Sequence, residues 1–182
     1  MTWTAFHNRG ETLRSVITTS SARRDGLLPM DLAGVDRHFD GELDLLAALT
    51  LKWHTRLSGQ IERMLAHQPL DLEQAVATAW SNAAHELPGV RLIIDHYRAH
   101  PLDDAMDRAM TTAAAKEHYL LAVMAGRSGL GSFDRAARVG AGIEERARLL
   151  HRGSPLIVPE APVEEPEERP GLRERLRAVV AA

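Results

Sequence analysis

The sequence predicts an all-α protein, an antiparallel helical bundle of about five helices. Apolar residues recur every three or four positions over long stretches, which is typical of amphipathic helices. Before the C-terminal tail, no alternation of apolar and polar residues runs longer than four positions, so strands are not indicated. Aromatic residues make up 4% of the 182 residues and hydrophobic residues 45%, so the core must be built from aliphatic side chains.

The first two helices are expected at about 3–20 and 32–67, the second with Asp31 as its N-cap. The first carries an apolar stripe at spacings of three and four: Trp3, Phe6, Gly10, Leu13 and Ile17. The second carries the most regular stripe in the chain: Leu46, Leu49, Trp53, Leu57, Ile61 and Met64.

A third helix is expected at about 71–99, opened by a capping box of Asp71 and Gln74 and kinked at Pro88. Proline lacks the amide hydrogen and clashes with the preceding turn, which predicts a kink or a short break. The expected apolar stripe before the kink is Val76, Trp80, Ala83 and Leu87.

The last two helices of the bundle are expected at about 103–126 and 133–151, the second capped by Ser132. Gly140 and Gly142 are either positions of close helix packing or weak points of the last helix. Its apolar stripe is Phe133, Ala136, Gly140, Ile143, Ala147 and Leu150.

The composition divides the chain into a bundle domain at 1–152 and an appendage at 153–182. The appendage begins as an extended linker rich in proline and glutamate. It ends in a short stretch of helical spacing, with Leu172, Leu176 and Val179 on one face and arginines mostly off it. A basic amphipathic helix of this kind suits docking on its own bundle, on a partner subunit or on another protein.

Charge and cysteine content exclude several classes of function. The net charge of −3 and a pI near 6.3 make a nucleic-acid partner an unfavoured expectation, because phosphate contacts need a concentrated basic surface. The absence of cysteine excludes disulfides, thiol catalysis and thiolate metal sites. With neither a signal-peptide pattern nor an apolar run of spanning length, we expect a cytoplasmic protein without a membrane span.

Two pairs of residues have the spacing of metal ligands on a helix. His38 and Glu42 stand four apart, as do His96 and His100, so each pair could share one helical face. The alternative interpretation of His38 and Glu42 is the capped first turn of an ordinary helix. For His96 and His100, Pro101 disfavours a helical second histidine, so the two rings need not face one another.

Glu117 is the most informative polar residue, because it occupies an apolar stripe between Ala113 and Leu120. A buried carboxylate costs several kcal/mol unless it is paired or bound. We therefore expect a partner for it: an arginine from another helix, a metal ion, or a histidine such as His54 or His85.

The histidine and carboxylate pairs resemble parts of three families of helical metalloproteins. The His-xxx-Glu and His-xxx-His pairs resemble those of hemerythrin-like proteins, and Glu42 with Glu117 resembles the glutamates of ferritin-like proteins. A histidine followed by His-xxx-His is similar to the DinB-like arrangement. Each resemblance covers two or three residues, and none assigns a family. The resemblances imply iron, manganese or zinc held among His38, Glu42, His54, Glu117 and His118.

These features predict a non-enzymatic interaction or regulatory module that associates with itself or with a protein partner through its C-terminal helix. Neither a nucleophile elbow nor a phosphate loop is present, since the glycines of 126–131 follow an expected helix. The first alternative is a metal-binding bundle protein. The second is a bundle with a small-ligand pocket beside the break at Pro88.

Overall fold

The computed structural model describes residues 3–127 and 133–152, with the backbone alone for residues 3–7. The described chain is mainly helical and contains no strand, which confirms the all-α prediction. The helices are α1 (Trp3–Arg23), α2 (Val35–His38), α3 (Glu42–Ala66), α4 (Leu72–Glu86), α5 (Pro88–Ala99), α6 (Asp104–Met124) and α7 (Phe133–His151).

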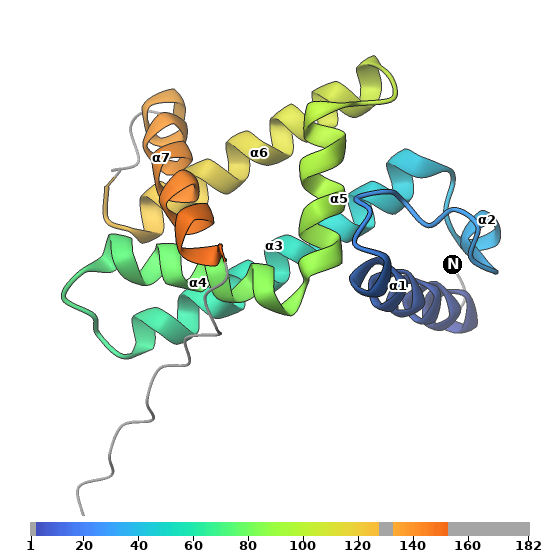
Figure 1. The fold of residues 1–182 in the computed structure, drawn as a ribbon, viewed down its shortest axis with the longest axis horizontal. Coiled ribbons are helices and arrows are strands. Elements are labelled where there is room, and N and C mark those ends of the chain that lie inside the picture. The colour runs from blue at the N-terminus through green and yellow to red at the C-terminus, as the bar shows by residue number, and fades with distance from the viewer. Residues whose placement is uncertain (1–2, 128–132, 153–182) are drawn as a thin grey trace, which may run out of the picture.

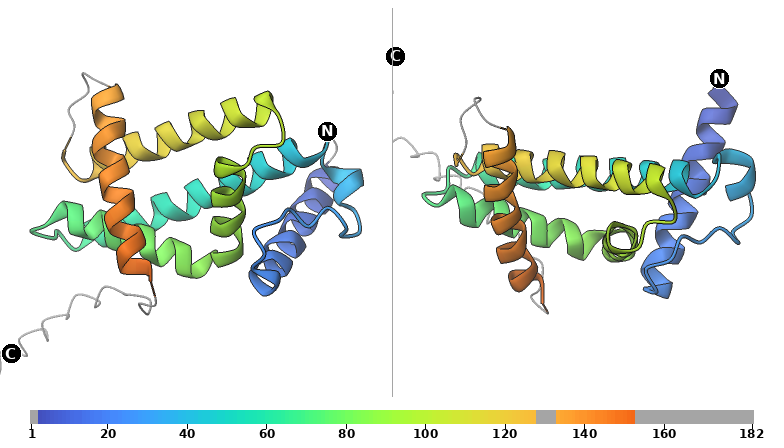
Figure 2. Two further views of the ribbon diagram at one scale, coloured as in Figure 1. Left: turned by 45° about the horizontal axis from the view of Figure 1, so that its top comes forward. Right: turned by 90° about the horizontal axis from the view of Figure 1, so that it is seen from above.

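The helices surround one hydrophobic core, with α5 and α7 lying across α3 and α6 (Figure 1). Figure 2 shows the same crossing from two further directions, with α1 at the far end from α7. The most extensive helix contacts join α6 to α7, α3 to α4 and α4 to α7, and α1 packs mainly on α5. Among the described helices, none combines the length and the apolar character that crossing a membrane requires.

The prediction of one helix over 32–67 is wrong, because two glycines interrupt it. Gly34 and Gly41 have φ angles of 87° and 88°, values that side-chain-bearing residues rarely adopt. The short α2 therefore ends at His38, and α3 starts afresh at Glu42. Asp31 is not an N-cap, and its carboxylate instead accepts hydrogen bonds of 2.8 and 2.6 Å from Arg23.

The kink or short break expected at Pro88 is a break of one residue, Leu87, between two helices. Leu87 leaves the helical region, with φ −127° and ψ 53°, and Pro88 becomes the first residue of α5. Proline fits that position because the first amide of a helix has no intrahelical partner. The capping prediction at Asp71 is confirmed, since its carboxylate accepts a 2.9 Å hydrogen bond from the Gln74 amide.

The apolar stripes of α3 and α4 form the centre of the core, as predicted. Trp53 and Trp80 are buried there, with ring centroids 5.4 Å apart in an edge-to-face arrangement. In α1 the predicted stripe is displaced by one position, because the buried residues are Thr12, Val16 and Ser20. The expected side-chain positions of Trp3 and Phe6, the Ser132 cap and the whole appendage 153–182 lie outside the described part.

Two glycines allow helix backbones to touch. A Cβ atom on Gly89 would lie 2.2 Å from the Ser20 carbonyl carbon, and one on Gly140 would lie 1.8 Å from the His118 carbonyl oxygen. The close-packing interpretation of Gly140 is therefore confirmed, whereas nothing lies within 4 Å of a Cβ on Gly142. These contacts fix where α5 meets α1 and where α7 meets α6.

Candidate functional site

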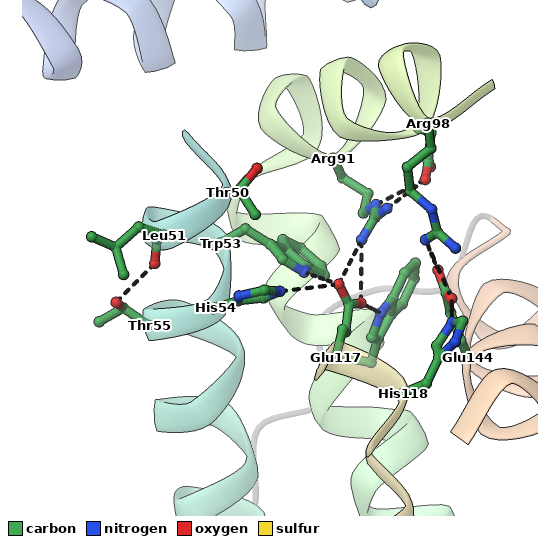
Figure 3. A network of polar contacts seen from close by, with 12 residues as sticks. Thr50, Leu51, Trp53, His54, Thr55, Arg91, Arg98, Glu117, His118 and Glu144 are labelled. Carbon is green, nitrogen blue, oxygen red and sulfur yellow. Dashed lines mark hydrogen bonds and ion pairs between the residues drawn. The ribbon is translucent and has the colours of Figure 1, made fainter. Parts of the chain in front are cut away.

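Glu117 on α6 lies at the centre of a buried polar cluster, and its residue surface is 3% exposed. The indole nitrogens of Trp53 and Trp80 donate to its two carboxylate oxygens over 3.0 and 2.9 Å. A His54 ring nitrogen, Nε2, lies 3.4 Å from Oε2 and makes no other hydrogen bond. Figure 3 shows Trp53 and His54 pointing toward the carboxylate from α3, and Arg91 pointing toward it from α5.

Arg91 supplies the charge that the buried carboxylate needs. Its Nη1 atom lies 3.3 and 3.5 Å from the two oxygens of Glu117, and its side chain is 4% exposed. The guanidinium carbon also lies 4.8 Å from the ring centroid of Trp53 and 5.5 Å from that of Trp80. Contacts of a cation with aromatic faces stabilise the charge further. The expectation that Glu117 is buried and paired is thus confirmed, with Arg91 and His54 as partners.

The cluster continues from Arg91 through alternating charges to α7. Arg91 donates to Asp95 through Nη2 and Nε over 2.5 and 3.1 Å, and Arg148 donates to the same carboxylate over 2.5 and 2.8 Å. Arg148 also donates to Glu144 over 2.7 Å. Glu144 in turn receives a hydrogen bond from His118 and lies 3.1 Å from Arg98. We call the set Glu117, Arg91, Asp95, Arg148 and Glu144 the charge chain.

The charge chain keeps its three carboxylates ionised. Burial raises the pKa of Glu117, but the charge of Arg91 and the hydrogen bond from His54 outweigh it, so the pKa lies below its ordinary value. Burial also raises the pKa of Asp95. The hydrogen bonds and charges of Arg148 and Arg91 have the larger, opposite effect, so the pKa of Asp95 lies below its ordinary value. The pKa of Glu144 lies well below its ordinary value for the same reason, with His118 as the strongest opposing partner.

These properties make Glu117 a structural anchor. Its oxygens already accept from two indoles and an arginine, and its low pKa makes it a weak base at neutral pH. Because its partners come from α3, α4 and α5, the carboxylate ties four helices to one point. A satisfied buried polar network of this kind fixes one arrangement of the helices.

The predicted ligand pair His38 and Glu42 does not form on one helix, because α2 ends at the histidine and α3 starts at the glutamate. The His38 ring is instead hydrogen-bonded to Thr12, with Nδ1 2.8 Å from Oγ1. Glu42 is exposed at the first turn of α3.

The remaining predicted ligands fall into separate places. His54 and Glu117 are neighbours, but His118 points to Glu144, on the other side of α6. The His96 and His100 rings do lie together, with centroids 5.2 Å apart, although His100 has left the helix. Among the side chains of residues 8–127 and 133–152, no three histidines or carboxylates are placed to hold a metal ion.

The site also contains four residues that were not predicted from the sequence: Arg91, Asp95, Arg148 and Glu144. A signal existed for Glu144, because it directly follows Ile143 on the buried face of α7. A second signal lay in the tryptophans, since a buried indole N–H needs an acceptor. Trp53, Trp80 and Glu117 each lie on an apolar stripe, so the two indoles were candidate hydrogen-bond donors to the carboxylate.

The chain was compared with protein-family models, with curated proteins and with solved structures. None of them matches. The function is therefore argued from the geometry alone.

The charge chain predicts that stability decreases as the pH falls. Folded carboxyl groups with lowered pKa values bind protons less readily than unfolded ones, so their contribution is complete above pH 5 and is lost below it. Burial and the nearby His85 lower the pKa of His151, which acts in the same direction between pH 7 and pH 5. We expect these three carboxyl groups alone to lower the free energy of unfolding by about 2 kcal/mol between pH 7 and pH 4.

Urea denaturation followed by circular dichroism at several pH values measures this change. The Asp95→Asn variant, which lacks one of the three groups, should show a shallower dependence of the unfolding free energy on pH. An unfolding free energy that stays constant from pH 6 to pH 4 would contradict the prediction.

Proposed function

We propose that the protein is a non-enzymatic interaction module that self-associates, with the groove between α3 and α6 as its docking surface. The groove has a volume of about 510 Å³ and is lined mainly by apolar side chains. It is the observation that carries the proposal. Its lining residues are Leu43, Leu46, Ala47, Thr50, Leu51, His54, Arg108, Ala109, Met110, Thr112, Ala113 and Lys116.

The groove has the form that an additional helix would fit. In the first half of α6, only Met106 and Met110 are buried. The other side chains of that half are exposed or half-buried, so no other described helix covers them fully. Leu51 on the opposite wall is 68% exposed, although leucines in folded cores are normally buried. Small lining residues, such as Ala109 and Ala113, allow a helix backbone to approach the groove closely.

The occupant that we propose is the segment 171–182 of a second copy of the chain. Its apolar residues Leu172, Leu176 and Val179 have the i, i+4, i+7 spacing by which a helix enters a groove. The chain from Arg152 to this segment could extend over about 60 Å, which exceeds the length of about 38 Å expected for the 25 residues of α3. Five glutamates at 160–168 precede the segment, and they complement Arg108 and Lys116 at the groove. Symmetric homodimers are the commonest oligomers of soluble proteins, and exchange of an identical segment is a low-cost way to form them.

Light scattering on the full-length protein tests the proposal. We expect a dimer at about 100 μM, and a monomer when Leu51→Asp charges the groove or Leu176→Asp charges the segment. The matched control is Leu70→Asp, because Leu70 is fully exposed outside the groove. A monomeric parent protein, or a dimer that survives both substitutions, would contradict the proposal. The expected cytoplasmic location and the absence of a nucleic-acid partner stay predictions.

A further inference from the structure

A second pocket lies where α4, α5 and α7 meet the end of α1, away from the α3–α6 groove. Its volume is about 370 Å³, equal to about a dozen water molecules of liquid. One part of the wall is apolar and consists of Trp80, Pro88 and Leu92. The rest is polar and includes Arg24, Arg91, Asp95, Arg148, His151 and Arg152.

The pocket holds more positive than negative charge. Four arginines line it against the single carboxylate Asp95, and that carboxylate is already shared by Arg91 and Arg148. Arg24 and Arg152 form no ion pair with any residue that the structure describes. Two guanidinium groups are therefore left to bind an anion, and arginine is the side chain best suited to carboxylates and phosphates.

Two histidines beside the pocket leave nitrogens without partners. Nδ1 of His151 and Nε2 of His85 are buried and make no hydrogen bond with a described residue, and the two ring centroids lie 4.4 Å apart. A buried polar atom without a partner costs about 1–3 kcal/mol. Since His151 lines the pocket, a buried histidine nitrogen without a described partner lies next to the space for a ligand.

We propose that this pocket binds a small organic anion with a planar apolar body. The anionic group lies among Arg24, Arg152 and His151, and the body lies against Pro88 and Leu92, next to the nearly buried Trp80. An apolar wall with a few convergent polar groups is the usual form of a small-molecule site. The site is independent of self-association, because it shares no lining residue with the groove.

Titration of the full-length protein with benzoate tests the proposal, followed by the ¹⁵N-indole NMR signal of Trp80. Benzamide has the same shape without the charge, and inorganic phosphate has the charge without the apolar body. We expect benzoate to shift the signal saturably and the other two probes to leave it in place. Removing both free cations with Arg24→Gln and Arg152→Gln should weaken benzoate binding by about tenfold or more.

The matched control is the double variant Arg37→Gln and Arg63→Gln, which removes two exposed arginines that line neither the pocket nor the α3–α6 groove. It should bind benzoate as the parent protein does. The proposal is overturned if benzoate gives no saturable shift, if benzamide or phosphate gives the same shift, or if the control variant weakens binding equally.

Discussion

Replacing Arg91 with methionine is expected to destabilise the protein by about 3–5 kcal/mol. Methionine has a similar length and no charge, so the substitution removes the ion pairs with little loss of volume. Glu117 would then stay buried with two indole hydrogen bonds and no cation, and Asp95 would keep only Arg148. The expected loss is a large part of the 5–15 kcal/mol that stabilises an ordinary domain.

Denaturant unfolding at pH 7 measures this loss, and Arg56→Met provides the control. Arg56 pairs with Glu86, but its side chain is 44% exposed, so we expect a change of at most about 1 kcal/mol. If the Arg91→Met protein does not fold, Arg91→Lys gives a second measurement, because lysine keeps the charge but not the forked geometry. A change of under about 1 kcal/mol for both Arg91 variants would mean that the charge chain does not stabilise the fold.

The double variant Arg91→Met with Glu117→Gln separates the pair from its surroundings. Glutamine keeps an acceptor for the indoles and removes the charge that arginine neutralises. We expect the combined cost to be smaller than the sum of the two single costs, because the second change relieves the unpaired charge left by the first. Additive costs would show that Arg91 acts through Asp95 and the tryptophan rings, and not through Glu117.

The fold class could be predicted from the sequence because helical periodicity is a local property. The stripes of α3 and α4 needed only their own residues, as did the cap at Asp71. The interruption at Gly34 and Gly41 was not predicted, since a glycine costs only about 1 kcal/mol within a helix and sequence alone does not show which glycines take positive φ. At Pro88 the sequence predicted a kink or a short break, and the short break is what the structure has.

The site could be predicted only in part, because its members come from different helices. Glu117 was identified by its position on an apolar stripe, which is again a local signal. The pairing of Glu117 with Arg91 depends on how α5 crosses α6, and no periodicity reports that crossing. The His38 and Glu42 pair failed for a related reason, since its geometry assumed a continuous helix that the glycines interrupt.

Replacing Gly140 with alanine is the second substitution with a large expected effect, about 3 kcal/mol of destabilisation. The new methyl group would overlap the backbone of α6, with the His118 carbonyl oxygen, carbon and Cα all within 2.7 Å. A helix backbone cannot move aside as a flexible side chain can, so α7 must shift as a body. Glu144 lies one turn further along α7, and the shift would also separate it from His118 and Arg98.

Gly142→Ala is the matched control, since it makes the same change two residues away in the same helix. No atom lies within 4 Å of its Cβ, so only helix propensity acts, and we expect stabilisation of about 0.5–1 kcal/mol. Thermal and urea unfolding of both variants should therefore show changes of opposite sign. Equal effects of the two substitutions would mean that α6 and α7 do not touch at Gly140. The close contact at Gly140 would then not be what positions Glu144 in the charge chain.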